Sequence, residues 1–325
     1  MTTPRSHLAH AAEWFTIIRT AYGHDPLYLH GEDAGGRRGT LPAFIVRRPM
    51  GGTIVSSMPF LDGGGPCSSS VALDHALVTR LLEEASRRGA DRVELRCAHR
   101  LEIGWEPMEH KVNLTLRLPA DSARLWQGFD GSVRNQIRKA ERSGLAVESG
   151  GVEKLDDFYA IFATRMRELG SPAHARGFFA AVLDGFGARA RVTLVRKGTT
   201  PIGGLIGLAH QDVLTVPWAS CLSPYLKLCP NMLLYWETMG AACREGFQRF
   251  DFGRSSRGSG TYRFKRQWGA EEQPLLWYTI PMDRRRARPV AGRGRAAALL
   301  TGSWKHLPLA VTRTLGPCIR RYLTQ

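Results

Sequence analysis

The sequence lacks the features that mark membrane-spanning and secreted proteins. No window approaches the roughly 18 consecutive apolar residues that a membrane-spanning helix needs. Near the N-terminus, where a signal peptide would have its apolar stretch, His7, His10 and Glu13 interrupt the apolar positions. We therefore expect a cytoplasmic protein.

The sequence also lacks the common metal and nucleophile motifs. Its six cysteines include no Cys-x-x-Cys pair and have no histidine at zinc-ligand spacing. The glycine run at 63–65 is followed by Pro66 instead of the Gly-Lys-Ser/Thr of a phosphate loop, and neither Gly-x-Ser-x-Gly nor His-Glu-x-x-His occurs. We therefore predict reduced thiols and no metal.

Acidic residues are absent from the end of the chain. The 325 residues contain 45 Lys and Arg against 29 Asp and Glu, a formal net charge of +16. Ten of the basic residues and no acidic residue lie within 284–325, and subtracting these ten from 16 leaves +6 for the first 283 residues. Such an excess predicts polyanionic partners, namely a phosphorylated substrate, RNA or an acidic membrane surface. We expect no DNA partner.

Apolar periodicity predicts two mixed α/β domains, at 1–120 and 121–282, followed by a basic tail at 283–325. The boundary near 120 follows a strictly alternating strand that ends at Pro119. In the first domain we expect helices at 8–22 and 73–85, an antiparallel meander at 28–30, 40–47 and 53–57, and a strand at 92–97. In the second we expect helices at 132–143, 154–169, 176–186 and 230–246, and strands at 192–196, 201–209, 213–220, 249–252 and 275–280.

A basic stripe lies on the predicted helix at 132–143. Arg134, Arg138 and Arg142 recur every fourth residue and so line one side of it, while apolar residues face the core. Guanidinium groups bind phosphate oxygens in pairs, and a helix N-terminus adds partial positive charge. The stripe therefore indicates either a phosphate site or an ordinary solvated helix face.

A second polar cluster follows the strand at 249–252. A Gly/Ser/Arg loop leads into a segment where cations alternate with Tyr262, Phe264 and Trp268. If these aromatic residues are buried, Lys265 among them is partly desolvated, and such a lysine stabilises an oxyanion or acts as a base. Asp251 either pairs with a neighbouring cation or only ends the strand.

Together these stretches resemble the FemAB-like proteins, including those associated with exosortase and exopolysaccharide loci. These bacterial proteins are grouped in the GNAT superfamily with the Fem aminoacyltransferases and the BioF2-like acetyltransferase domain. The resemblance covers about 23–280 and rests on several motifs in order: 60–66, 134–140, 230–236, 250–255 and 262–269, with a similar tail at 304–308 and 315–317.

The resemblance implies a mixed α/β fold of tandem GNAT-like domains that transfers an acyl or aminoacyl group to an amine. In Fem transferases the donor is a charged tRNA, the acceptor is a peptidoglycan precursor, and a Phe-Lys pair lies at the site of transfer. Phe264 and Lys265 occupy that motif, and Asp251 is the third candidate catalytic residue. Arg134 would contact the phosphates of the acceptor. The other implied substrate-binding residues are Asn135, Arg138, Arg254, Ser255, Tyr262 and Trp268.

The donor loop departs from the GNAT pattern. GNAT enzymes bind the coenzyme A pyrophosphate with a glycine-rich loop before the central helix, whereas the segment 225–231 contains no glycine. Lys227 and Asn231 remain as candidates for one donor phosphate. The coiled-coil insertion of some Fem transferases is also missing. Acyl-coenzyme A and aminoacyl-tRNA therefore both remain open as donors.

Two functions from different classes fit the sequence. The first is an N-acyltransferase for a phosphorylated or lipid-linked precursor of the cell envelope or of an exopolysaccharide. The alternative is a non-catalytic module that binds tRNA or anionic membrane. In the tail, apolar residues from Trp304 to Leu323 alternate with cations, which indicates either an interfacial segment at the inner face of the cytoplasmic membrane or a poorly ordered extension.

Overall fold

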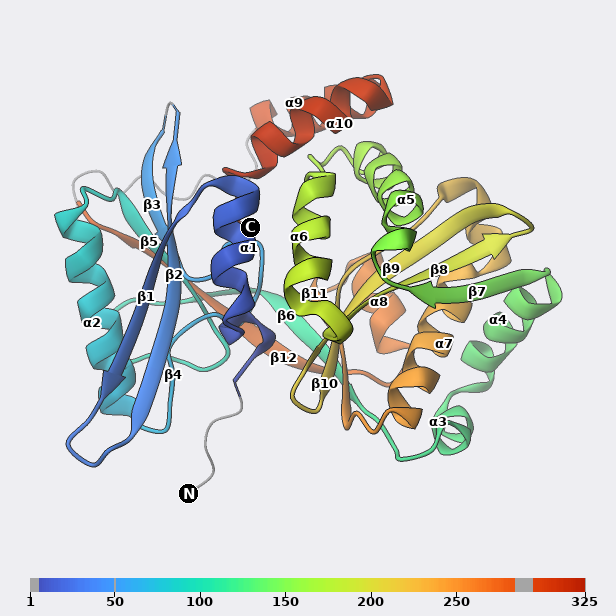
Figure 1. Ribbon diagram of the computed structural model, residues 1–325, viewed down its shortest axis with the longest axis horizontal. Coiled ribbons are helices and arrows are strands. Elements are labelled where there is room, and N and C mark those ends of the chain that lie inside the picture. The colour runs from blue at the N-terminus through green and yellow to red at the C-terminus, as the bar shows by residue number, and fades with distance from the viewer. Residues whose placement is uncertain (1–5, 50, 284–294, 325) are drawn as a thin grey trace. The chain divides into compact units, whose positions relative to one another are not determined.

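The computed structural model describes residues 6–49, 51–283 and 295–324, which form two compact units (Figure 1). The first unit comprises Met1–Val112, Gln273–Gly292 and Arg321–Gln325, and the second comprises Asn113–Glu272 and Arg293–Arg320. The chain therefore returns to the first unit after completing most of the second, an arrangement that a single boundary near 120 does not describe. Among the described residues, no helix is both long and apolar enough to cross a membrane.

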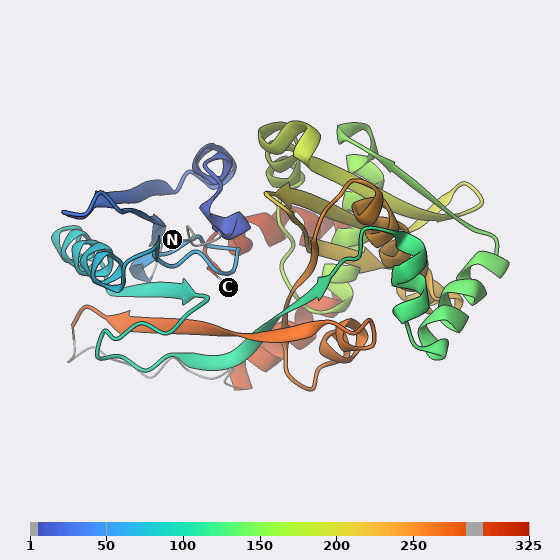
Figure 2. The same ribbon diagram turned by 90° about the horizontal axis from the view of Figure 1, so that it is seen from below.

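The first unit is a sheet with a helix on each face (Figure 1). Its strand order is β1 (Asp25–Glu32), β2 (Arg38–Arg48), β3 (Gly52–Ser56), β5 (Arg92–Cys97), β12 (Glu271–Pro281) and β6 (Met108–Arg117), with β4 (Cys67–Ser68) paired to β2. Strands β1 to β3 form the expected antiparallel meander. Strands β6 and β12 lie side by side and carry the chain between the units (Figure 2).

Helix α2 (Val71–Arg87) packs on the strands and forms a core with them in the first unit. Its buried residues Leu73, Leu77 and Leu81 pack against the strands, because every third or fourth residue of a helix faces the same side. The expected helix at 8–22 is divided into a 3-10 turn, Leu8–His10, and helix α1 (Glu13–Tyr22). The helix is interrupted because Ala11 has an extended backbone.

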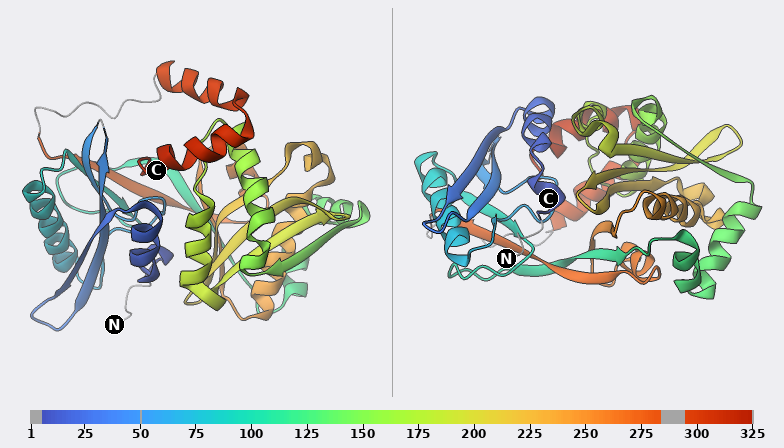
Figure 3. Two further views of the ribbon diagram at one scale, coloured as in Figure 1. Left: turned by 45° about the horizontal axis from the view of Figure 1, so that its top comes forward. Right: turned by 60° about the horizontal axis from the view of Figure 1, so that its bottom comes forward.

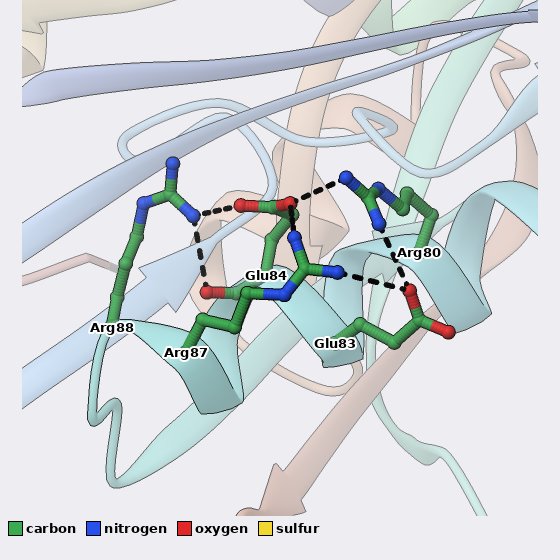
Figure 4. Close-up of polar contacts among 5 residues, drawn as sticks. All are labelled: Arg80, Glu83, Glu84, Arg87 and Arg88. Carbon is green, nitrogen blue, oxygen red and sulfur yellow. Dashed lines mark hydrogen bonds and ion pairs between the residues drawn. The ribbon is translucent and has the colours of Figure 1, made fainter.

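The exposed side of α2 carries an ion-pair network (Figure 4). The Glu84 carboxylate forms ion pairs with Arg80 at 2.8 Å, with Arg87 at 2.6 Å and with Arg88. The hydrogen bond from Arg88, with the three guanidinium charges, lowers the pKa of the Glu84 carboxyl. Glu83 pairs with Arg80 at 3.1 Å. These arginines therefore neutralise carboxylates of their own helix instead of forming a basic patch.

The second unit contains the strand order β11 (Arg249–Ser256), β10 (Val213–Cys221), β9 (Thr200–His210), β8 (Ala190–Lys197) and β7 (Leu145–Gly150). The expected helices are present as α4 (Gly131–Arg142), α5 (Leu155–Glu168), α6 (Arg176–Phe186) and α7 (Pro230–Arg244). Three elements were not predicted as such: α3 (Ser122–Gly128), edge strand β7 and the short helix α8 (Gly260–Arg266). Seven-residue helices and edge strands bury few residues, so their apolar periodicity is weak.

The described part of the tail folds onto the second unit (Figure 3). It forms α9 (Arg295–His306) and α10 (Leu309–Arg320), and α10 packs against α5. Pro308 separates the two helices, whereas Pro317 lies inside α10 and does not end it. Residues 295–306 and 309–320 are thus helical, so the alternative of a poorly ordered extension is wrong for them. The basic residues Arg284, Arg285, Arg286, Arg288 and Arg293 lie outside the described residues.

Candidate functional site

The sheet of the second unit opens between β10 and β11. The two strands run parallel and pair only from Val213 with Arg249 to Thr215 with Asp251, although they continue to Cys221 and Ser256. The register of β10 against β9 shifts between Thr215 and Trp218, and such an irregularity bends a strand. Beyond Thr215 the two strands therefore diverge, and groups on their facing edges can bind an extended ligand.

Lys265 lies beside this opening. It comes from α8 and is 8% exposed, which confirms the predicted desolvation. Its Nζ donates to the carbonyl oxygens of Gly253 at 2.9 Å and of Arg254 at 2.8 Å, both on β11. A buried ammonium is costly unless it is held by such acceptors. The structure therefore fixes a positive charge against the diverging end of β11.

Asp251 shapes the backbone that receives this ammonium. Its Oδ1 accepts the N–H of Gly253 at 2.7 Å, and the side chain is 4% exposed. Gly253 has a φ of +71°, the left-handed region that favours glycine. Asp251 thus stabilises the local bend of β11 whose carbonyl groups hold Lys265, and so it acts through the backbone.

The aromatic residues of the motif differ in their surroundings. Phe264 is half-buried, and its ring centroid lies 5.1 Å from that of Tyr235. Trp268 is 1% exposed and packs on Phe129 at 5.1 Å, which makes it a core residue, yet its indole Nε1 has no hydrogen-bond partner among the described residues. The hydroxyl of Tyr262 donates to Glu272 at 2.8 Å, a bond that raises the pKa of the phenol.

Two buried serine hydroxyls lie on the diverging strands. Ser255 of β11 and Ser220 of β10 are 4% and 6% exposed, and neither Oγ has a hydrogen-bond partner within the described part of the chain. A buried polar group without a partner costs about 1–3 kcal/mol, so each such group in a folded protein needs an explanation. A ligand bound between the strands would supply the missing partners. Ser220 was not predicted, because its sequence neighbours carry no motif.

His174 is a further group that the sequence did not reveal. It precedes α6, its ring stacks on Phe178 at 4.5 Å, and its Nε2 accepts the Nε–H of Arg320 at 3.1 Å. Burial lowers the pKa of His174 well below its ordinary value, and the charges of Arg320 and Arg254 act in the same direction. A neutral imidazole therefore links the aromatic core of the unit to α10, and Arg254 contributes positive charge nearby.

The arginine stripe of α4 is held by α3. Arg134 donates to the carbonyl oxygens of Trp126 at 3.4 Å and Gln127 at 3.3 Å, near the negative end of that helix. The guanidinium of Arg138 lies over the Trp126 ring, 5.3 Å from its centroid. Asn135 and Arg138 are exposed, and Arg134 is half-buried. The stripe thus keeps a solvent-facing positive surface, although Arg134 also has a structural role.

The N-terminus of α7 fits a donor pyrophosphate poorly. Cys229 takes the left-handed backbone, with a φ of +58°, that a glycine would otherwise adopt. Pro230 has no N–H, and the N–H of Met232 is bonded to Asn231 Oδ1 at 3.1 Å and to the Cys229 carbonyl at 3.0 Å. The Asn231 side chain thus accepts an N–H of its own first turn, and Lys227 remains exposed.

The predicted residues fall into three groups. Lys265 joins α8 to Gly253 and Arg254 of β11, next to Asp251 and Ser255. The α4 stripe is tied to the end of α8 by Gln136, whose Nε2 lies 3.5 Å from Gln267 Oε1, and by the packing of Phe129 on Trp268. Lys227 and Asn231 lie at the start of α7. Among the described residues no cluster of three or more His, Cys, Asp or Glu side chains has metal-binding geometry.

Comparison with known proteins agrees with this geometry. Residues 129–266 match the family model described as an acetyltransferase (GNAT) domain, which spans α4, the diverging strands and α8. A search of the curated proteins gives no match.

Solved structures resemble most of the chain. FemX superposes with a TM-score of 0.68 at 12% identity, covering 86% of this chain and 93% of its own. L-PGS from Bacillus licheniformis gives 0.53 at 11% identity, with coverage of 94% and 97%. A tandem GNAT protein from the clavulanic acid biosynthesis pathway gives 0.50 at 11% identity, with coverage of 86% and 98%. The chain therefore has a mixed α/β fold that resembles tandem GNAT proteins such as FemX, and its residues 129–266 match a GNAT acetyltransferase domain.

Proposed function

We propose that this protein is an N-acyltransferase that moves an acyl or aminoacyl group from an activated ester or thioester to an amine. The observation that carries the proposal is the buried ammonium of Lys265, fixed by two carbonyl groups where β10 and β11 diverge. The match of residues 129–266 to a GNAT domain supports the same reaction class.

In the proposed reaction the acceptor amine attacks the donor carbonyl. A bond forms between nitrogen and carbon, the carbonyl oxygen becomes an oxyanion, and the intermediate then expels the alcohol or thiol as the amine loses its proton. The charge of Lys265 stabilises the oxyanion, and one such interaction is worth about 3–4 kcal/mol of barrier. The hydroxyls of Ser220 and Ser255 would hydrogen-bond the reactants and so gain partners.

We propose that the acceptor is a phosphorylated or lipid-linked precursor of the cell envelope or of an exopolysaccharide. Its phosphates would meet the exposed cations of α4, Arg138, Lys139 and Arg142. The sequence resemblance to FemAB-like proteins supports an acceptor of this class. Because the first turn of α7 offers so few N–H groups, we assign no step to coenzyme A and leave acyl-coenzyme A and aminoacyl-tRNA as donors to be distinguished by assay.

The test is a transfer assay with labelled acetyl-coenzyme A and labelled aminoacyl-tRNA, each against a panel of amine-bearing lipid-linked and nucleotide-linked sugars. With the active pair, Lys265→Met should lower kcat about 10²–10³-fold, because it removes one charge from the oxyanion. Arg263→Met is the matched control: it removes a charge from the exposed side of α8, where Arg263 donates to the Gly258 carbonyl, and should leave kcat within about twofold.

Thermal unfolding of both variants separates chemistry from folding, and Lys265→Arg keeps the charge if the methionine variant is unstable. Equal kcat for the wild type and a folded Lys265→Met would remove Lys265 from the mechanism. If no donor and acceptor pair gives turnover, and only salt-sensitive binding to any polyanion is seen, the protein is a binding module instead.

A further inference from the structure

Helix α10 carries an apolar stripe that the second unit does not cover. Val311, Leu315 and Ile319 recur every fourth residue and are 37%, 48% and 41% exposed. On a helix this spacing places the three side chains in one row. The stripe, defined as these three residues, therefore forms a continuous apolar ridge.

The opposite side of α10 is fixed to the second unit (Figure 3). Thr312 and Gly316 are buried, and a Cβ built on Gly316 would lie 3.1 Å from the backbone N of Ala173, so the backbones are in close contact. Arg320 is bonded to His174, and Arg313 lies over the ring of Tyr159. Because three successive turns are held in this way, the helix cannot rotate to bury the stripe.

Trp304, the first apolar residue of the tail pattern, does not belong to this surface. Trp304 of α9 is half-buried, and its Cζ2 lies 3.7 Å from where a Cβ of Gly316 would be. It therefore fills the space between α9 and α10. The exposed large apolar side chains of α10 are those of the stripe.

The tail that carries the stripe has a strong excess of positive charge. The sequence from 284 to 325 contains ten basic residues and no acidic one, and Lys305 is exposed near the end of α9. The hydrogen bond from Arg176, and to a smaller extent the charge of Arg313, lowers the pKa of the Asp156 carboxyl on α5, and this carboxyl is already paired with Arg176 at 2.5 Å. A second copy of the chain would bring two such cationic tails together, which like-charge repulsion disfavours.

We propose that the stripe, assisted by the positive charge of the tail, docks on the surface of a membrane that contains anionic lipid, with α10 lying in the interface. Apolar side chains on one face and cations beside them are the two features that bind a helix to such a surface. The inference concerns α10 alone and does not depend on acyl transfer.

The test is co-sedimentation of the full chain with vesicles of phosphatidylcholine containing about one third phosphatidylglycerol, compared with phosphatidylcholine alone. We expect binding to the anionic vesicles only, weakened by 0.5 M salt and by Lys305→Gln. The variant V311Q/L315Q/I319Q should bind at least about tenfold more weakly, because the interface loses three apolar contacts.

The matched control is V152Q/L169Q, which changes two exposed apolar residues, 59% and 48% exposed, at the ends of the α5 segment. It should bind as the wild type does. Equal loss in both variants, equal binding to both vesicle types, or a dimer that the triple substitution dissociates would each overturn the proposal.

A second measurement avoids loss of function. In Leu315→Trp the new indole should be quenched by brominated anionic vesicles more strongly than the indoles of the wild type, because it enters the acyl boundary. No added quenching, with the variant folded as judged by thermal unfolding, would likewise overturn the proposal.

Discussion

At the scale of single residues, the second unit combines buried polar groups that a purely structural domain would avoid. The ammonium of Lys265 is held by two backbone carbonyls, and the hydroxyls of Ser220 and Ser255 have no hydrogen-bond partner in the described part of the chain. A buried hydroxyl without a partner destabilises the fold by about 1–3 kcal/mol. Their presence on diverging strands is therefore the physical reason to regard this place as a site.

His174 should make stability depend on pH. Its pKa is lowered in the folded state, chiefly by burial, so below its ordinary value of 6.5 the unfolded chain binds a proton that the folded chain does not. The free energy of unfolding should then be complete above pH 6.5 and fall as the pH drops below it, by up to about 1.4 kcal/mol per pH unit. In His174→Gln, whose amide oxygen can still accept from Arg320, that slope should be smaller.

Urea unfolding from pH 4.5 to 7.5, followed by circular dichroism, measures this effect. His306→Gln is the control, because His306 is exposed at the end of α9. It should retain the slope of the wild type. An unchanged slope in His174→Gln would show that His174 is not the group that titrates.

At this scale the sequence predicts which side chains are buried better than it predicts their hydrogen-bond partners. The burial of Lys265 followed from its aromatic neighbours, because a cation between residues of a core is desolvated with them. His174 and Ser220 were missed, because only the folded chain shows whether a polar atom finds an acceptor. For the same reason the attachment of Arg134 to α3 was not predictable.

At the scale of elements, the bend of β11 at Gly253 couples this strand to helix α8 through Lys265. Gly253→Ala should destabilise the protein by about 1–2 kcal/mol, because alanine strains a backbone with a φ of +71°. It should also lower kcat at least about tenfold in an active transfer assay, because the carbonyl of residue 253 holds Lys265.

Gly258→Ala is the matched control for this variant. Gly258 has a φ of +74°, and a Cβ there would meet nothing within 4 Å, so the backbone strain is similar while Lys265 is untouched. Urea unfolding should show similar losses in the two variants, and kinetics should show a loss of kcat in Gly253→Ala alone. Equal kcat in both would mean that the bend does not position the lysine.

Elements with strong periodicity were predictable, and short ones were not. The strand predicted at 92–97 is β5, and the helix predicted at 176–186 is α6, because each alternates or repeats its apolar residues clearly. Helix α8 was not predicted, because it is short and follows a loop rich in glycine and serine; Ser259 of that loop is its N-cap and accepts the N–H of Tyr262 at 3.1 Å. Strand β7 reads as polar because it is an edge strand.

At the scale of the whole molecule, the sequence predicts the fold class but not the path of the chain. A mixed α/β fold resembling tandem GNAT proteins follows from the order of strands and helices and from the motifs. The return of β12 to the first unit and the use of the last residues in both units are set by contacts distant in sequence, which periodicity does not encode. The tail, which the sequence separates by its charge, is thus part of both units.

Truncation should reveal these two structural roles of the tail separately. In the first unit, the Thr324 carbonyl accepts the N–H of Phe60 at 3.1 Å and an N–H of Arg96, a residue only 2% exposed. The Thr324 hydroxyl donates to Glu94 at 2.6 Å. A chain ending at Arg320 lacks the Thr324 carbonyl, one of the carbonyl groups to which the buried guanidinium of Arg96 donates; two others belong to Met58 and Leu61. Because a buried charge then loses an acceptor, the free energy of unfolding of the first unit should fall by about 3 kcal/mol.

A chain ending at Asp283 should in addition destabilise the second unit, because it removes the packing of α10 on α5 and the bond from Arg320 to His174. Hydrogen exchange resolved by mass spectrometry reads the two units independently. The chain ending at Arg320 should exchange faster in β3 and β5 and as slowly as the full chain in α5 and α6. The chain ending at Asp283 should exchange faster in both regions. If the chain ending at Asp283 exchanged as slowly as the full chain in α5 and α6, the tail helices would be dispensable for the second unit.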